Sequence, residues 1–304
     1  MNLQNLRVFL KVAELEHITR ASEELHLTQP AVTKIMQSLE QEVQLDLIER
    51  QGRRIVLTYA GHILQIYARQ MFALEREMDD ALAALRDIKR GEIKLAANTI
   101  AGVYLLPTIV ARFRALYPEI GLKISILNSQ DIVEHILDWS LDFGIVEGDV
   151  DHLPEGLKVR FFTRDTLILV AAPSHHWCGS EAVRPAGLGL EELVIRERGS
   201  GIRDMLERDL LKRGVTLKPL LTLTDNEAIK QMVINGVGAA IVSSLSVKRE
   251  LMNGDLVQIP LIDMDIHPEL SFIQRSDKQL SRAAQEFLTF LYSSTDDPTV
   301  SSVG

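Results

Sequence analysis

The sequence predicts a chain of three structural parts: a small helical unit with a β-hairpin over residues 1–58, one long helix over 59–90, and an α/β domain over 91–294. Three observations indicate this division. Residues 3–43 place apolar side chains at intervals of three and four, residues 59–90 keep that spacing without a proline, and the remainder alternates strand-like with helical runs. The last segment, 295–304, is small and polar, so we expect a flexible tail.

The composition indicates a soluble globular protein of a reducing compartment. Hydrophobic residues make up 46% and charged residues 25% of the 304 positions. A single cysteine, Cys178, excludes an internal disulfide. No signal peptide and no apolar run of membrane-spanning length is readable, so we expect a cytoplasmic protein without a membrane partner. We also expect no metal site, because His175 and His176 have no further His or Cys at ligand spacing.

The net charge of −9 argues mildly against a nucleic-acid binder, which is usually basic. The charge is unevenly distributed, however. Residues 1–90 carry 12 basic and 13 acidic side chains, a net charge of −1, and the remaining residues carry a net charge of −8. The net charge of residues 1–90 is therefore close to zero and argues little against nucleic-acid binding by that part of the chain.

The stretch LHLTQPAVTKIMQSLE, residues 25–40, contains a proline one residue before a helical apolar pattern. Proline is tolerated in the first turn of a helix, where backbone N–H groups have no intrahelical partner. We therefore expect Thr28 to be the N-cap and Pro30 to stand in the first turn. Thr19 is the expected N-cap of the preceding short helix. Two helices joined by a tight turn form a helix-turn-helix.

A small hairpin is expected directly behind these helices. Gln51 and Gly52 are typical of a turn, and Ile55 begins an apolar run that fits a return strand. The hairpin would form a wing beside the helix-turn-helix.

The long helix carries an apolar seam with steps of four and three residues. One interpretation is a helix pair between two copies of the chain, and the alternative is a helix that lies on the core of its own domain. The seam residues are Ala60, Leu64, Tyr67, Met71, Leu74, Met78, Ala81, Leu85 and Ile88.

The alternation of strands and helices after residue 91 predicts a largely parallel sheet covered on both faces. The first helix of this region is not preceded by Gly-x-Gly-x-x-Gly, which disfavours a dinucleotide-binding fold. No constellation of nucleophile, acid and base is readable either, so we expect no enzyme.

The stretches ITRASEELHLTQPAVTKIMQSLE and LIERQGRRIVLTYAG resemble the DNA-binding domain of the LysR-type transcriptional regulators. The resemblance continues through the chain: VYLLPTIVARFRALYPEI and NEAIKQMVINGVGAAIVS are typical of the two lobes of that family's effector domain. It implies a winged helix-turn-helix over 1–58, a linker and dimerisation helix over 59–90, and a two-lobed α/β effector domain similar to type 2 periplasmic binding proteins. Lobe I would comprise about 91–163 and 266–294, and lobe II about 164–265.

The helix-turn-helix resemblance also implies DNA-contacting residues. The start of the second helix would enter the major groove, where Gln29 can pair with a base edge. Unlike many members, this chain has no basic residue near Gln37 and Ser38, so the wing arginines would supply much of the phosphate grip. The expected contacts are Thr28, Gln29, Pro30, Ala31, Thr33, Lys34, Arg50, Arg53 and Arg54.

An effector site is expected beyond the carboxyl ends of the strands, where helix N-termini favour anions. The segment RERGSGIR stands out, because glycines admit an anion and Arg203 could grip a carboxylate. Arg203 could instead pair with an acid of its own helix, and Asn226 could be a helix cap. The expected effector residues are Thr99, Ile100, Asn128, Ser129, Glu147, Arg198, Gly199, Ser200, Gly201, Arg203 and Asn226.

The expected function is a ligand-responsive, sequence-specific DNA-binding transcription regulator that responds allosterically to an anionic metabolite between the lobes. The alternative is a solute-binding protein with a two-lobed cleft. The expected partners are double-stranded operator DNA and a small-molecule effector, with no cofactor. The resemblance further implies a homodimer through the linker helix, a homotetramer built as a dimer of dimers, and allows a contact with RNA polymerase.

Overall fold

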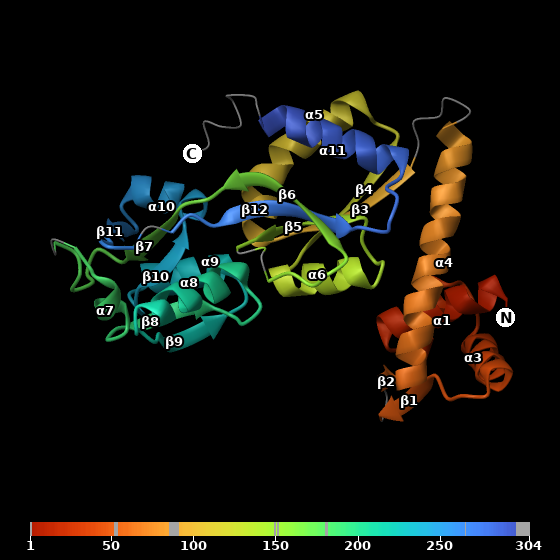
Figure 1. Cartoon of the computed structure of the whole chain (residues 1–304). Helices are drawn as coiled ribbons and strands as arrows, with labels where there is room; N and C mark the ends of the chain where they lie inside the picture. Colours follow the sequence, from red (N-terminus) through yellow and green to blue (C-terminus); the bar gives the residue numbers. More distant parts are fainter. Residues whose placement is uncertain are drawn as a thin grey trace. The chain divides into compact units, whose positions relative to one another are not determined.

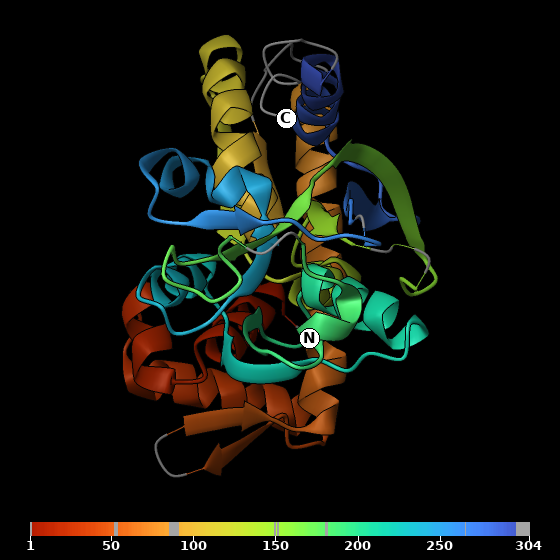
Figure 2. The same ribbon diagram turned by 90° about the vertical axis from the view of Figure 1, so that its left-hand side faces the viewer.

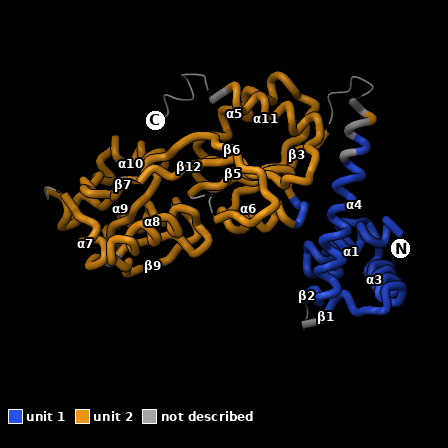
Figure 3. The backbone as a smooth tube through the Cα atoms, in the orientation of Figure 1, with its two compact units in different colours: residues 1–79, 138–140 blue, residues 80–137, 141–304 orange. Residues whose placement is uncertain are grey.

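A computed structural model describes residues 2–51, 54–84, 91–148, 150, 152–179, 182–264 and 266–295. The chain divides into two compact units, shown in Figure 3. The first comprises Met1–Asp79 with Asp138–Ser140, and the second comprises Asp80–Leu137 with Leu141–Gly304. Each unit has its own hydrophobic core and is described separately.

The first unit is built from three helices around one core (Figure 1). The helices are α1 (Leu3–Leu15), α2 (Ile18–Glu24) and α3 (Gln29–Val43). The apolar positions that predicted them face inward, since Phe9, Val32 and Leu39 have no measurable exposure. Side chains three and four residues apart share one helix face, so the apolar spacing gives each helix one face that packs into the core.

The predicted cap of α3 is confirmed, whereas that of α2 is wrong. Thr28 Oγ1 accepts from the backbone N–H of Ala31 at 3.4 Å, and Pro30 stands in the first turn. Helix α2 begins one residue before Thr19, with His17 at the N-cap position and no side-chain cap bond. Ile18 is buried in the core, and its burial explains why the helix starts earlier than capping preferences predict.

The wing is an antiparallel hairpin of β1 (Ile48–Gln51) and β2 (Arg54–Leu57), followed directly by α4 (Tyr59–Ala84); both are visible in Figure 2. Thr58 joins them, because its hydroxyl donates to the Asp46 carbonyl and accepts from the Gly61 N–H at 3.0 Å. A Cβ at Gly61 would lie 2.1 Å from the Leu47 carbonyl oxygen. Only glycine permits this approach.

Helix α4 uses two faces differently. Ala68 and Phe72 are buried in the core of the first unit, as the second interpretation of the sequence required. The first two residues of the predicted seam, Ala60 and Leu64, also pack against this core. The next four face outward: Tyr67 and Leu74 are 62% and 65% exposed, and Met71 and Met78 are exposed too. Of the other seam residues, Leu85 and Ile88 lie outside the described residues, as does the side chain of Ala81.

The second unit contains two lobes. Lobe I holds a five-stranded sheet of order β4-β3-β5-β12-β6, with α5 (Leu106–Leu116) and α11 (Arg282–Thr295) on one face and α6 (Ser129–Leu137) on the other (Figure 1). The strands are β3 (Gly91–Ala97), β4 (Ile120–Ile126), β5 (Phe143–Glu147), β6 (Leu157–Arg164) and β12 (Glu269–Arg275). A π-helical turn, η1 (Ala101–Leu105), leads from β3 into α5.

Lobe II holds two smaller sheets, of order β10-β7-β11 and β8-β9. Its strands are β7 (Leu167–Ala171), β8 (Glu192–Arg196), β9 (Lys218–Leu223), β10 (Ala240–Ser243) and β11 (Val257–Ile259). Its helices are α7 (Pro185–Leu188), α8 (Gly201–Lys212), α9 (Asn226–Ile234), η2 (Ser244–Ser246) and α10 (Lys248–Asn253).

The expectation of a largely parallel sheet is wrong. β3 pairs in parallel with β4 and β5, but β12 is antiparallel to both β5 and β6, and β7 is antiparallel to both β10 and β11. β6 was not predicted, because an edge strand with mostly exposed and charged side chains lacks a clear apolar pattern.

The chain crosses between the lobes twice, and the two crossing segments hydrogen-bond to each other. Asp165 N–H donates to the Pro268 carbonyl at 2.9 Å, and Leu167 N–H donates to the Ile266 carbonyl at 3.0 Å. Two paired segments connecting two lobes form the hinge arrangement through which such lobes move.

Candidate functional site

The start of α3 presents an exposed polar surface. Gln29, Pro30 and Lys34 are exposed, and Thr33 and Ala31 are half-buried. Thr28 is exposed as well, although its hydroxyl caps the helix. Exposed amide, hydroxyl and ammonium groups on the first turns of the second helix are the groups that such a motif presents to base edges.

Positive charge is scarce on this surface. Gln37 and Ser38 are exposed and neutral, so Lys34 is the single cation along α3. On the wing, Arg54 is 73% exposed, and its Nε lies 2.6 Å from a carboxylate oxygen of Glu16. Arg53 lies outside the described residues, and so does the side chain of Arg50. The acidic partner reduces the positive potential that Arg54 offers to a phosphate.

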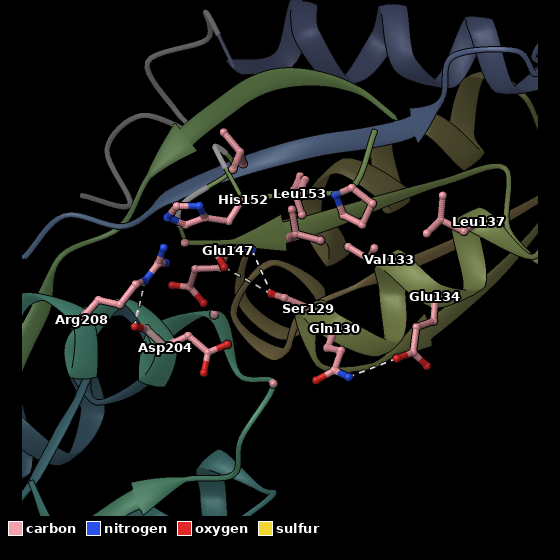
Figure 4. Close-up of a pocket in the computed structure, with 16 residues that line it drawn as sticks. Ser129, Gln130, Val133, Glu134, Leu137, Glu147, His152, Leu153, Asp204 and Arg208 are labelled. Atoms are coloured by element: carbon pink, nitrogen blue, oxygen red, sulfur yellow. Dashed lines mark hydrogen bonds between the residues drawn. The ribbon is translucent and has the colours of Figure 1, made fainter. Parts of the chain in front are cut away.

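A pocket of about 500 Å³ lies between the two lobes (Figure 4). Lobe I supplies residues from α6, from the end of β5 and from the following loop, and lobe II supplies the loop before α8 and its first two turns. Four residues expected from the sequence line it: Ser129, Glu147, Gly199 and Gly201.

The lobes meet closely along one edge of this pocket. A Cβ at Gly201 would lie 1.7 Å from the Glu147 carbonyl oxygen, so glycine is required for the approach. Gly199 has φ +85° and a carbonyl that accepts from the Gln130 N–H at 3.3 Å. Ser129 Oγ accepts from the Glu147 N–H at 3.2 Å and donates to the Glu147 carbonyl at 3.3 Å. These contacts align the N-termini of α6 and α8 on the same pocket.

The pocket walls carry charges of both signs. Arg208 and His152 are the basic lining residues, and Glu134, Glu147 and Asp204 are the acidic ones. Burial raises the pKa of Glu147 well above its ordinary value, and burial also raises the pKa of Asp204. Both shifts act toward the uncharged acid, and the shift of the buried Glu147 is the larger one.

Several other expected effector residues perform structural tasks. Arg203 is 8% exposed and donates to Glu207 and to the Arg196 carbonyl, each within 2.9 Å, which corresponds to the alternative considered for it. Asn226 Oδ1 accepts from Arg196, but Asp225 is the cap of α9. Asp225 was not predicted as the N-cap, because Asn226 has a side-chain oxygen equally suited to capping one residue later.

The remaining expected residues lie outside this pocket's lining. Asn128 caps α6 by accepting from the Asp131 N–H at 2.8 Å. Ile100 is 1% exposed and packs in the core of lobe II. Thr99 is half-buried, Ser200 is buried, and Arg198 is exposed.

Sequence reasoning missed five polar lining residues: Gln130, Glu134, His152, Asp204 and Arg208. Asp204 and Arg208 were detectable, because an acid and a base four residues apart follow directly on the glycine-rich loop. His152 had no signal, since only the fold brings its loop to α8.

The group of His175, His176 and Glu191 also escaped prediction. His176 Nε2 lies 3.3 Å and His175 Nε2 3.9 Å from the Glu191 carboxylate. The Glu191 carboxylate thus adds a third possible ligand, which the search for further His or Cys residues did not consider. The Trp177 N–H donates to His175 Nδ1 at 3.2 Å, so a neutral His175 carries its proton on Nε2, toward Glu191. In that tautomer His175 offers no Nε2 lone pair to a metal, and the absence of a metal stays a prediction.

The first unit and the two-lobed second unit together define a DNA-binding regulator with a ligand-binding domain. Comparison with known sequences identifies the family. Residues 3–62 match the family described as bacterial regulatory helix-turn-helix protein, lysR family, and residues 86–295 match the LysR substrate binding domain. The chain belongs to the LysR-type transcriptional regulators and is a ligand-responsive, sequence-specific DNA-binding regulator.

Individual relatives agree with this assignment. The chain is 34% identical to the RuBisCO operon transcriptional regulator of Allochromatium vinosum over 296 residues, which cover 96% of each chain. It is 29% identical to the regulator CysL of Bacillus subtilis, over 95% of this chain and 96% of that one.

Two solved structures have a similar fold. Full-length CbnR, solved with its target DNA, superposes with a TM-score of 0.69 at 23% identity and covers 97% of this chain and 100% of its own. The regulatory domain of Synechocystis PCC6803 CcmR in complex with 2-PG superposes with a TM-score of 0.63 at 26% identity, over 68% of this chain and 99% of that one. In the described part of this chain, no helix is long and apolar enough to cross a membrane.

Proposed function

We propose that this regulator binds a small anion in the pocket between its lobes and that the bound anion shifts the protein toward the closed arrangement. The observation that carries this proposal is the convergence of two helix N-termini, α6 from lobe I and α8 from lobe II, on one pocket. The partial positive charge of a helix N-terminus favours an anion. At α6 this charge is the main contribution, because the Gln130 and Asp131 N–H groups already donate to Gly199 and Asn128.

The pocket chemistry supports an anion further. Arg208 stands on the wall supplied by α8, and its guanidinium can bond a carboxylate or a phosphate with two parallel donors. The raised pKa values of Glu147 and Asp204 reduce repulsion of a negative ligand. Because residues of both lobes would contact the ligand, binding energy favours the closed arrangement over an open one.

The test is thermal unfolding of the full chain with a panel of anions: inorganic phosphate, sulfate, small mono- and dicarboxylates, and 2-PG, with which the CcmR domain was solved. At least one anion should raise the midpoint temperature, and Arg208→Ala should weaken its binding about 10-fold. Lys212→Ala is the matched control, because Lys212 is an exposed cation at the other end of α8. If no anion stabilises the wild type, or if both variants behave alike, the proposed site is wrong.

We further propose that the regulator works as a homodimer joined through the exposed seam of α4, and as a tetramer built from two such dimers. Four exposed apolar side chains at alternating steps of four and three support the dimer: Tyr67, Met71, Leu74 and Met78. A dimer presents two recognition helices to a two-fold operator. We expect the regulator to act in the cytoplasm, where its DNA target lies. Contact with RNA polymerase and the absence of a cofactor or catalytic activity remain expectations of the same assignment.

Light scattering on Leu74→Glu tests the interface. A buried charge in the seam should shift the protein toward the monomer. Leu211→Glu is the control, because Leu211 is exposed to a similar extent, 68%, on α8. An unchanged assembly in Leu74→Glu would exclude the seam.

A further inference from the structure

Two buried carboxyl groups meet where lobe I joins the hinge. Glu147 ends β5 and is 5% exposed, and Asp165 lies in the first crossing segment and is 3% exposed. The two carboxyl groups lie close enough for each to affect the pKa of the other. Neither the sequence spacing nor the pocket chemistry described above explains why two acids should be buried together.

One oxygen of each carboxyl group has a fixed donor. Glu147 Oε2 accepts from Asn98 Nδ2 at 2.5 Å. The orientation of that amide is fixed, because Asn98 Oδ1 accepts from the Ala101 N–H at 3.0 Å. Asp165 Oδ1 accepts from the Thr166 N–H at 2.7 Å, and the Ser243 hydroxyl also bonds to Asp165.

The other two oxygens, Glu147 Oε1 and Asp165 Oδ2, are fully buried, and no N–H or O–H group of the described residues donates to them. Two ionised carboxylates in this position would repel each other and leave both oxygens unsatisfied. A single proton between them removes the repulsion and satisfies both atoms. The geometry therefore requires one acid of the pair to be protonated.

We propose that Glu147 and Asp165 share one proton, carried by Glu147, and that this proton stabilises the closed arrangement of the lobes. The hydrogen bonds then form a continuous series from Ser243 of lobe II through Asp165 of the hinge, Glu147 and Asn98 to the start of η1 in lobe I. The proton is the link that joins the hinge to lobe I.

The surroundings of Glu147 explain how the proton depends on lobe closure. The backbone of Glu147 is covered by Gly201 of lobe II, so opening the lobes brings water to the carboxyl group. Burial is the largest cause of its raised pKa, Asp165 adds to it, and Arg196 opposes it. For Asp165, burial again raises the pKa, while Ser243, Thr166, Glu147 and the positive charge of His267 oppose it.

The sign of the pH effect follows from the difference in the Glu147 pKa between the closed protein and the open or unfolded one. The closed protein holds one proton more than the open or unfolded one, because its Glu147 pKa lies well above the ordinary value of 4.5. The stabilisation is therefore complete below that ordinary value and is lost as the pH rises through the raised pKa. A ligand that selects the closed arrangement should bind more weakly at high pH, a consequence that rests on the proposed function.

The test compares wild type, Glu147→Gln and Asp165→Asn as full-length proteins without ligand. Glutamine reproduces the protonated carboxyl group, since its amide can donate to Asp165 and accept from Asn98, but it cannot lose the proton. Between the ordinary value of 4.5 and the raised pKa, the wild type should lose about 3–5 °C of midpoint temperature per pH unit relative to Glu147→Gln, and above the raised pKa the difference should stay constant. Glu155→Gln, at an exposed position of lobe I, should follow the wild type. His267→Gln removes the influence of that imidazole on Asp165 and should leave the difference between wild type and Glu147→Gln in place.

Infrared difference spectroscopy supplies a second measurement that does not depend on stability. At neutral pH the wild type should show the C=O stretch of a protonated carboxyl group, and Glu147→Gln should lack it. If Glu147→Gln fails to fold, the same band followed in the wild type against pH still decides the question. An absent band, or pH profiles for wild type and Glu147→Gln that stay parallel from pH 4.5 upward, overturns the proposal. Failure of every anion in the panel would refute the proposed ligand site while leaving this result intact.

Discussion

The surface of α3 and the pocket between the lobes are both sites of recognition, yet they are built in opposite ways. The α3 surface comes from one continuous stretch, and Gln29, Pro30 and Lys34 are exposed without support from distant residues. The pocket is assembled from segments around residues 130, 150 and 200, and contacts such as those of Ser129 with Glu147 hold these segments together. A local site tolerates substitution without loss of shape, whereas an assembled site depends on close contacts between its parts.

The largest effect is expected from a side chain added at Gly201, where the two lobes approach each other most closely. Gly201→Val would place side-chain atoms within the space of the Glu147 carbonyl, so the lobes could not approach. Anion affinity should fall on the order of 100-fold, about 3 kcal/mol, while operator binding without ligand is retained. Thermal shift and mobility shift measure the two properties. Gly121→Ala is the control, since its Cβ would meet nothing closer than 3.6 Å, and equal ligand affinity in both variants would contradict the role of this contact.

Removal of a structural arginine should act on stability and leave specificity unchanged. Arg203→Ala leaves the Arg196 carbonyl without its donor and removes a nearly buried guanidinium. We expect a loss of about 2 kcal/mol in unfolding free energy, measured by denaturant titration. If stability is unchanged and only ligand binding falls, Arg203 contacts the ligand directly.

The local site should respond to a change in one amide. Gln29→Ala should lower the ratio of operator to non-specific affinity by about 10-fold, about 1.4 kcal/mol, with non-specific affinity unchanged. Competition mobility shifts with operator and random DNA measure this ratio. Gln4→Ala alters an exposed glutamine of the same unit and should leave the ratio as it is. An unchanged ratio in Gln29→Ala would remove this residue from base recognition.

The smallest effect is expected at the single cation of α3. Lys34→Ala should weaken binding to all sequences alike and reduce the slope of log affinity against log salt by about 1. A change in sequence preference instead would place Lys34 at a base. Together these variants test whether α3 reads bases through neutral groups while its own single charge adds little to the affinity.

How far the sequence predicts each site follows from this contrast. Thr28 and Pro30 act within one turn of helix, so local rules located the start of α3 correctly. Arg203 and Asn226 have the chemistry of ligand contacts, but other groups of the chain already occupy them. The sequence allowed Arg203 to pair with an acid of its own helix, which is Glu207, whereas the contacts of both residues with Arg196 of β8 become visible only in the folded chain. The mixed sheet was missed for a related reason: β12 returns from the far end of the chain to lie between β5 and β6.

Helix α4 belongs to two structures at once. Phe72 anchors it in the core that positions α3, while Leu74, two residues later, lies on the exposed seam. Two chains joined along that seam would hold their recognition helices at a fixed separation, because no flexible joint lies between seam and core. Such a dimer would bind only half-sites that lie at a matching distance on the DNA. The distance between its recognition helices would change only if the two α4 helices slid or rotated against each other.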